Sequence, residues 1–149
     1  MQLASLGNRL YKLFETHKKK FLYIPLAFYW LIIFTLTSLP GNSIPRMILG
    51  FSDKAKHFGA YLVLSFLLNF ALHFQNKYKI SNKYSASFTF LIISIYGLFD
   101  EVHQIFVPGR YFEWLDFLSD LIGGLMGIFI SQWIINQNKK NSDFGTELL

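Results

Sequence analysis

The chain of 149 residues contains no cysteine and few charged residues. The absence of cysteine excludes a disulfide framework, a thiol nucleophile and a zinc–thiolate site. Charged residues make up 15% of the chain, whereas about 25% is usual in soluble proteins. Hydrophobic residues reach 52%, with 17 Phe, 8 Tyr and 3 Trp. This composition is too apolar for disorder and too poor in charge for a water-facing surface, so it predicts a small integral membrane protein.

Sequence signatures of soluble nucleotide chemistry are also missing. The chain has no Walker loop, no dinucleotide-binding fingerprint and no Gly-x-Ser-x-Gly elbow. These absences disfavour a nucleotide-dependent enzyme or a serine hydrolase of the familiar type.

Four apolar runs are long enough to cross a bilayer, for which about 20 residues are needed. They cover residues 21–39, 57–74, 85–107 and 114–135. Pro-Gly pairs follow the first run at Pro40 and the third run at Pro108. The first run is longer than a signal-peptide core, so we expect it to be an uncleaved helix. The sequence therefore predicts an all-α integral membrane bundle of four transmembrane helices.

The predicted organisation has three parts. A basic N-terminal segment covers residues 1–20, a four-helix transmembrane domain covers residues 21–136, and a tail covers residues 137–149. No internal repeat or second domain is visible.

Basic residues collect at one side of the predicted membrane. Ten lie beside one set of helix ends: Arg9, Lys12, Lys18, Lys19, Lys20, Lys77, Lys79, Lys83, Lys139 and Lys140. The opposite set has only Arg46, Lys54, Lys56 and Arg110. The positive-inside rule therefore predicts that both termini are cytoplasmic. The net charge of +5 reflects this topology, so nucleic acid is not an expected partner.

Polar residues follow one face of the second predicted span. His57, Tyr61, Ser65, Asn69 and His73 recur at every fourth position, which aligns them along the helix. On the fourth span, a stripe of small residues should let another helix approach closely. This stripe consists of Ser119, Gly123, Gly127 and Ser131.

Acidic residues lie inside the third and fourth predicted spans, near their outward ends. They are Asp100, Glu101, Asp116 and Asp120. An ionised carboxylate in lipid is costly unless it is paired or faces water. We therefore expect these side chains to turn inward, toward Lys54, His57, His103 and Arg110. The sequence predicts a buried polar cluster beneath the outer membrane surface.

The pattern of these residues resembles the VanZ-like family of small bacterial membrane proteins, named after a teicoplanin-resistance accessory protein. The resemblance covers roughly residues 44–130. Its motif positions are Asp53, Lys54, His57, Tyr61, Asp100, Glu101, Gln104, Pro108, Gly109, Arg110 and Asp116. Asp120 is a departure, because the family more often has Asn there. The resemblance implies a multi-pass protein of the bacterial cytoplasmic membrane and a link to glycopeptide resistance, without assigning a reaction.

Candidate roles follow from residue chemistry. Asp100, Glu101 and His57 are the candidate catalytic residues, because intramembrane acids are commonly functional and imidazole titrates near neutrality. The candidate ligand-binding residues are Lys54, Arg110, Gln104, Tyr61, Asp53, Asp116 and Asp120. An arginine can clamp a phosphate or carboxylate with two hydrogen bonds.

Structural interpretations of the same residues stay open at the level of sequence. Arg110 could instead pair with Asp116, Glu113 or Glu101 and fix the loop. Lys54 could pair with its neighbour Asp53. His103 is expected to be satisfied by a backbone carbonyl or an Asp. The acids as a group could serve as a network that ties the second, third and fourth spans together.

No cofactor is expected. Carboxylates and His would suit Mg²⁺ or Zn²⁺, but a metal site is only a minority alternative, because no single helix carries a His-x-x-x-His or Glu-x-x-His pair. The expected partners are the lipid bilayer and a lipid-linked or glycopeptide ligand. One hypothesis is an enzyme that acts on an amphipath with an anionic head. The alternative is a non-catalytic accessory or binding module, and transport by an oligomer is a weaker third option.

The absence of native cysteine makes the predicted topology directly testable. Ser43→Cys should react with a membrane-impermeant maleimide in intact cells, because the positive-inside rule places this position outside. Ser81→Cys and Ser142→Cys should react only after the cells are permeabilised. The reverse labelling pattern would contradict the predicted orientation.

Overall fold

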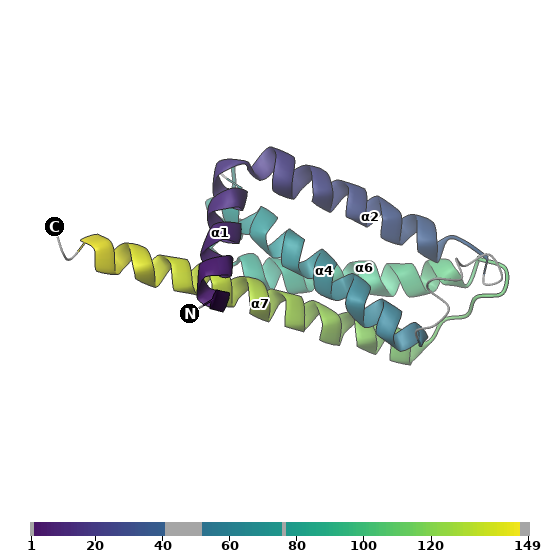
Figure 1. The fold of residues 1–149 in the computed structure, drawn as a ribbon. Helices are drawn as coiled ribbons and strands as arrows, with labels where there is room; N and C mark the ends of the chain where they lie inside the picture. Colours follow the sequence, from purple (N-terminus) through teal and green to yellow (C-terminus); the bar gives the residue numbers. More distant parts are fainter. Residues whose placement is uncertain (1, 41–51, 76, 147–149) are drawn as a thin grey trace.

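The computed structural model describes residues 2–40, 52–75 and 77–146, and these residues form helices and their connections without a strand (Figure 1). The helices are α1 (Gln2–Thr16), the short π-helix η1 (Lys19–Tyr23), α2 (Ile24–Thr37), α4 (Asp53–Phe74), α5 (Lys79–Lys83), α6 (Ser85–Gln104) and α7 (Trp114–Thr146). Three residues considered in the sequence analysis lie outside the described residues: Gly41, Ser43 and Arg46.

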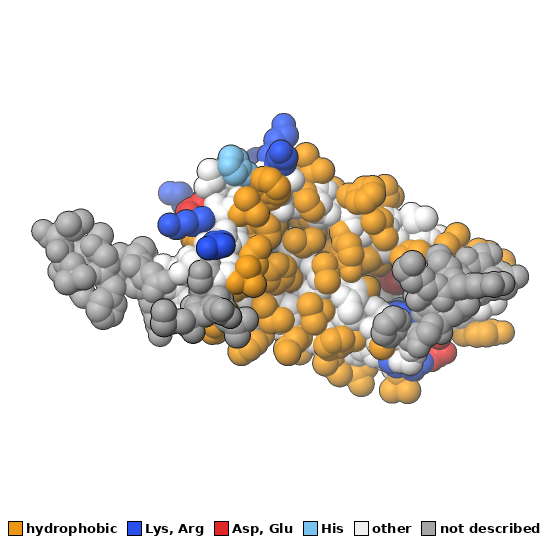
Figure 2. Space-filling view, viewed as in Figure 1, with side chains coloured by type: hydrophobic (Ala, Val, Ile, Leu, Met, Phe, Trp, Pro, Cys, Tyr) orange, Lys and Arg blue, Asp and Glu red, His pale blue; other side chains and the backbone are white. Residues whose placement is uncertain are grey.

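Four helices are long and apolar enough to cross a membrane, which confirms the predicted all-α bundle. The candidate spans are Lys19–Thr37, Asp53–Phe74, Ser85–Gln104 and Trp114–Lys139. Figure 2 shows hydrophobic side chains over the middle of the visible face and charged side chains gathered toward its two ends. This distribution is typical of a protein whose middle lies in lipid.

The helix boundaries differ from the predicted spans at the end that carries the acids. α4 begins at Asp53, four residues earlier than predicted, because the Ser52 hydroxyl accepts a hydrogen bond from the backbone of Ala55 and caps the helix. α6 ends at Gln104, and a turn follows in which Gly109 has a φ of 75°. Glycine occupies this left-handed region without the steric cost that a side chain would add.

The N-terminal segment, predicted only as basic, contains a helix. α1 crosses the bundle near the end where α2 begins and α4 ends (Figure 1). Phe14 of α1 is buried in a cluster with Leu22, Phe70 and Phe74. The Lys18 ammonium donates a hydrogen bond to the Phe74 carbonyl at 2.8 Å. These contacts fasten the N-terminal segment to α4.

The closest packing in the bundle joins α4 to α7. A Cβ atom at Gly123 would lie 2.1 Å from the backbone oxygen of Phe58, and one at Gly127 would lie 2.2 Å from that of Leu62. Only glycine permits this approach of two backbones. The prediction that small residues on the fourth span admit another helix is therefore confirmed, and that helix is α4.

A buried layer of uncharged polar groups connects three helices toward the end of the bundle where α4 ends and α6 begins. The Asn69 amide donates to the Ser131 hydroxyl at 2.7 Å, and Gln132 donates to the Ser85 hydroxyl at 3.0 Å. Thr89 and Gln132 also donate to the Asn69 carbonyl oxygen, at 3.4 and 3.3 Å. The inner part of the polar stripe on α4 thus has structural partners from α6 and α7.

α2 is the peripheral helix of the bundle. Buried residues make up 11% of its span, against 50% for α4. The Tyr29 hydroxyl donates to the Ala60 carbonyl of α4 at 3.2 Å, and Trp30 packs edge-on against Tyr96 of α6. Most of α2 therefore faces outward, where a bilayer would lie.

We predict that Gly123→Ala destabilises the protein by about 1–3 kcal/mol, because its Cβ must push two helix backbones apart. The measurement is the melting temperature of the purified protein in detergent. The matched control is Gly59→Ala, which adds the same atom to α4 where nothing lies within 4 Å. Equal melting temperatures for Gly123→Ala and the wild type would contradict the close packing of α4 on α7.

Candidate functional site

The predicted polar cluster is present where α4 and α7 begin and α6 ends. Asp100 is 1% exposed, and Glu101 and Asp120 are each 0% exposed. His57 and Asp116 are also buried. Carboxyl groups this deep require partners, and the neighbouring helices determine which partners each of them finds.

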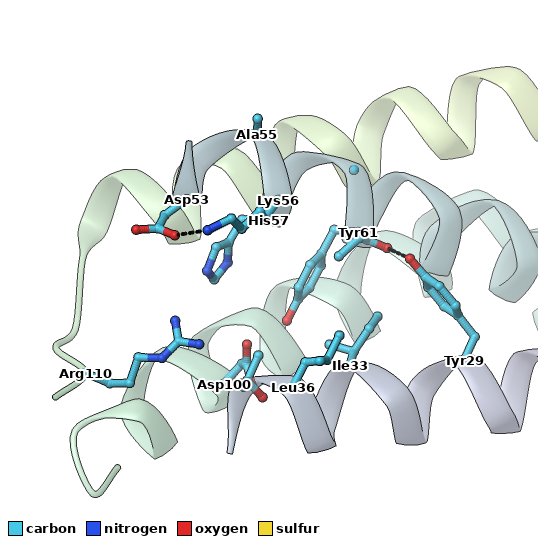
Figure 3. A pocket seen from close by; sticks show the side chains of 13 residues that line it. Tyr29, Ile33, Leu36, Asp53, Ala55, Lys56, His57, Tyr61, Asp100 and Arg110 are labelled. Atoms are coloured by element: carbon cyan, nitrogen blue, oxygen red, sulfur yellow. Dashed lines mark hydrogen bonds and ion pairs between the residues drawn. The ribbon is translucent and has the colours of Figure 1, made fainter. Parts of the chain in front are cut away.

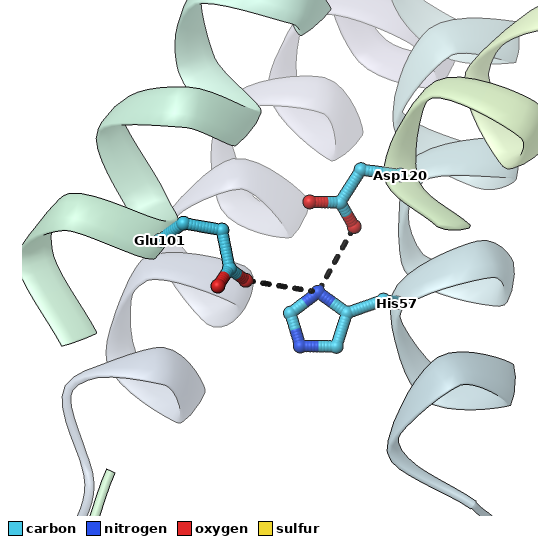
Figure 4. Close-up of side chains that lie close together, drawn as sticks. All are labelled: His57, Glu101 and Asp120. Atoms are coloured by element: carbon cyan, nitrogen blue, oxygen red, sulfur yellow. Dashed lines mark hydrogen bonds and ion pairs between the residues drawn. The ribbon is translucent and has the colours of Figure 1, made fainter. Parts of the chain in front are cut away.

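His57 lies at the centre of three helices. Its Nδ1 atom is 2.9 Å from Asp120 Oδ1 of α7 and 3.8 Å from Glu101 Oε1 of α6 (Figure 4). The other ring nitrogen, Nε2, is 3.9 Å from Asp116 Oδ2. α4, α6 and α7 each contribute to this group, so its geometry depends on their packing. We call His57, Glu101 and Asp120 the histidine–carboxylate group.

Glu101 is held in place from two directions. Its Oε2 atom accepts a hydrogen bond from the backbone N–H of Glu113 at 2.9 Å. Its Oε1 atom accepts one from the Gln104 amide at 3.4 Å, and Gln104 is buried beside it. Glu101 therefore fixes the connection between α6 and α7 while its other oxygen faces His57.

Lys54 bridges two acids of the opposite segment. Its ammonium forms an ion pair with Glu113 and another with Asp116 Oδ1 at 3.0 Å. The neighbouring Asp53 is paired with Lys56 instead, at 2.7 Å. The pairing of Lys54 with Asp53 considered from sequence is therefore not formed, and Lys54 fastens α4 to the start of α7.

Arg110 takes up none of the ion pairs considered for it. Within the described part of the chain, no carboxylate lies within ion-pair distance of its guanidinium, and its buried Nε has no hydrogen-bond partner. The Arg110 backbone N–H donates to the Val107 carbonyl at 3.1 Å, which closes the turn at Gly109. This turn directs the guanidinium toward Asp53, His57 and Asp100 (Figure 3).

A cavity of about 390 Å³ lies beside the histidine–carboxylate group. Its apolar wall includes Ile33 and Leu36 of α2 and Ala60 of α4, and Arg110 and Asp100 line its polar part. The Tyr61 hydroxyl, directed toward Asp100, and Asp100 Oδ2 are buried without hydrogen-bond partners among the described residues (Figure 3). The cavity thus joins an apolar space to a guanidinium, a carboxyl and a hydroxyl.

The structure brings all ten predicted site residues to one end of the bundle. His57, Glu101, Gln104, Asp116, Asp120 and Lys54 form the connected cluster, and Asp53, Tyr61, Asp100 and Arg110 line the cavity. His103 lies apart, with its ring next to Phe34 and Phe99. His73 lies near α1 at the other end, beside Tyr11.

Sequence reasoning missed the contribution of α2 to the cavity. Tyr29, Ile33, Leu36 and Thr37 line it, but α2 is apolar on every side. The sequence of α2 therefore has no alternation of apolar and polar residues that would distinguish its bundle-facing side from its outward-facing side. Glu113 was considered only as a partner of Arg110, whereas it pairs with Lys54.

Comparison with known protein families shows which family the chain resembles. A family described as VanZ/LLP1 matches residues 4–135, which is most of the chain. No curated protein and no solved structure matches it. The matched region contains all four candidate spans up to residue 135 and every residue of the cavity and the cluster. The chain belongs to the VanZ-like family of membrane proteins.

Proposed function

We propose that this VanZ-like protein binds and acts on an anionic amphipath of the bacterial cell envelope, such as a phospholipid or a lipid-linked precursor. The observation that carries the proposal is the Arg110 guanidinium, which forms no ion pair with any described residue, at an otherwise largely apolar cavity. A half-buried guanidinium whose Nε has no partner among the described residues is suited to bind an anion, and the cavity offers room for one.

The size and position of the cavity support an amphipathic ligand. Its volume of about 390 Å³ falls in the range of small-molecule pockets, roughly 300–1,000 Å³. One wall comes from α2, most of which faces outward. A molecule in the surrounding bilayer would therefore have to pass only one helix layer to enter. An acyl chain fits the wall at Ile33 and Leu36, and an anionic head fits Arg110.

The polar side of the cavity supplies groups for chemistry on a bound head. Asp100 Oδ2 is buried, unpartnered and next to the cavity, so it is suited to accept a proton from a hydroxyl or a water. His57 also lines the cavity and is held by Asp120. Lys54 is already engaged by Glu113 and Asp116, so we assign it to positioning the helices rather than to the ligand.

The distribution of basic residues supports placing this site at the outer face of the cytoplasmic membrane. Arg9, Lys12 and the run Lys18–Lys20 lie near the opposite end of the bundle, together with α5. In that orientation the cavity opens at the level of outer-leaflet head groups, and the maleimide labelling described above tests it.

We expect the purified wild-type protein to retain an anionic lipid that two cavity variants lose. Arg110→Gln removes the guanidinium, and Gly59→Phe fills the cavity, because open space surrounds Gly59. Lipid mass spectrometry of protein purified in mild detergent with EDTA measures retention, and we expect a loss of at least about tenfold, comparable to the loss of one charged hydrogen bond.

Two matched variants control for this measurement. Arg9→Gln removes an exposed arginine from α1, and Val63→Phe adds a ring to an outward-facing position of α4. Both should retain the lipid as the wild type does. Equal retention by all five proteins, or no anionic lipid in any of them, would refute the proposed ligand.

A non-catalytic accessory role is the second candidate function. It is favoured by the contacts that Lys54, Glu101 and Glu113 make between helices, because these assign part of the cluster to structure. In this case the ligand would alter the envelope by occupancy of the cavity, and the acids would only maintain the fold.

Asp100→Asn distinguishes the two candidates. This variant keeps the shape of a side chain whose Oδ2 has no partner to lose, but it cannot accept a proton. If expression of the wild type raises the teicoplanin concentration that inhibits growth, an enzyme should lose the effect in Asp100→Asn, whereas an occupancy mechanism should keep it. Glu15→Gln, at the opposite end of the bundle, is the control. No effect of the wild type would contradict the link to resistance.

A further inference from the structure

The geometry points to a divalent metal ion site at the histidine–carboxylate group, with His57, Glu101 and Asp120 as ligands and Zn²⁺ or Mn²⁺ as the class of ion. This inference does not rest on the amphipath proposed above, because it is argued from the spacing and charge of these three side chains, of which only His57 lines the cavity. Its ligands come from three helices, one each from α4, α6 and α7.

The three side chains have the spacing that a small metal ion requires. One ligating atom from each lies within 4.8 Å of the other two. The two distances from His57 Nδ1 are 2.9 Å to Asp120 Oδ1 and 3.8 Å to Glu101 Oε1 (Figure 4). Two ligands at about 2.0–2.2 Å from an ion lie roughly 3–4 Å apart. One imidazole nitrogen and two carboxylate oxygens suit Zn²⁺ or Mn²⁺.

The charge of the buried region supports a cation. Asp100, Glu101 and Asp120 are each exposed by 1% or less. Lys54 pairs with Glu113 and Asp116, and His57 is the side chain that lies within ion-pair distance of both Glu101 and Asp120. One imidazolium can balance only one of the two carboxylates beside it, whereas a divalent cation can balance both.

Unpartnered polar atoms next to the group provide independent support. Asp120 Oδ2, Asp100 Oδ2 and the Tyr61 hydroxyl are buried and lack hydrogen-bond partners among the described residues. Asp120 Oδ2 and the Tyr61 ring both lie within 3.4 Å of where a Cβ of Gly97 would be, so they share one space. Buried polar atoms normally have partners, and a hydrated ion brings water molecules that serve as such.

The surroundings orient the proposed ligands as outer-shell groups do in metal sites. Asp116 Oδ2 lies on the Nε2 side of His57, at 3.9 Å, so it favours the proton on Nε2 and leaves Nδ1 for the ion. Glu101 uses Oε2 to accept the Glu113 backbone N–H, so Oε1 is directed at the group. Binding of an ion would replace a proton between Nδ1 and Asp120 Oδ1.

The test is a metal titration of the full-length protein in detergent, without added lipid. The protein is stripped with EDTA, dialysed and titrated with Zn²⁺, Mn²⁺ or Mg²⁺ by calorimetry, and its melting temperature is measured in parallel. We expect one equivalent of Zn²⁺ or Mn²⁺ per chain, tighter binding than for Mg²⁺, and a melting temperature that falls with EDTA and recovers when the ion is restored.

Variants show whether the ion is bound at this group. Asp120→Asn and Glu101→Gln should each weaken binding by at least about tenfold while they retain the shape of the side chain. The matched control is Asp53→Asn, which removes an acid from the start of α4 that pairs with Lys56 outside the group. Its affinity should equal that of the wild type.

Two results would overturn the inference. One is the absence of stoichiometric binding of Zn²⁺ or Mn²⁺ to the wild type, a measurement that needs no variant to fold. The other is equal affinity of Asp120→Asn, Glu101→Gln and Asp53→Asn, which would place the ion elsewhere. The lipid measurement is made in EDTA and the metal measurement without lipid, so failure of one leaves the other standing.

Discussion

The structure depends on one constraint: a carboxyl group within a membrane bundle needs a partner, which another segment of the chain can supply. Asp120 meets His57, Glu101 meets the backbone of Glu113, and Asp116 meets Lys54. Each contact joins separate parts of the chain, so the buried acids also hold together the end of the bundle that carries them. The acids that could destabilise the bundle instead specify how its helices are arranged.

The glycines of α7 make those contacts possible. Because Gly123 and Gly127 admit the backbone of α4, His57 comes close enough to Asp120 for a hydrogen bond. A bulkier residue would move the imidazole away from the carboxyl by the same displacement that separates the helices. The small-residue stripe and the polar cluster are therefore coupled. The distance between the backbones of α4 and α7 at the glycines determines the distance between His57 and Asp120 in the polar cluster.

Much of this arrangement could be predicted from sequence, because hydropathy marks the four spans and the cost of buried charge drives Asp100, Glu101, Asp116 and Asp120 inward. The pairing of each acid could not be predicted. Lys54 pairs with Glu113 and Asp116 and not with its neighbour Asp53, because α4 begins before the start of the apolar run and includes both Asp53 and Lys54. The cavity could not be predicted from the sequence either, because α2 is apolar on every side and its sequence does not show which side faces α4. The orientation in the membrane and the roles of the site residues stay predictions.

The layer formed by Asn69, Ser131, Gln132, Thr89 and Ser85 has a further consequence for how the molecule works. Each hydrogen bond that this layer directs across the bundle ends on a neighbouring helix, and next to the layer Phe70 and Phe74 stack on each other within the cluster that contains Leu22 and Phe14. Among the described residues, this layer and the aromatic cluster separate the acidic side chains from the opposite end of the bundle. A polar molecule that reached those side chains would therefore leave on the side of the layer from which it had entered.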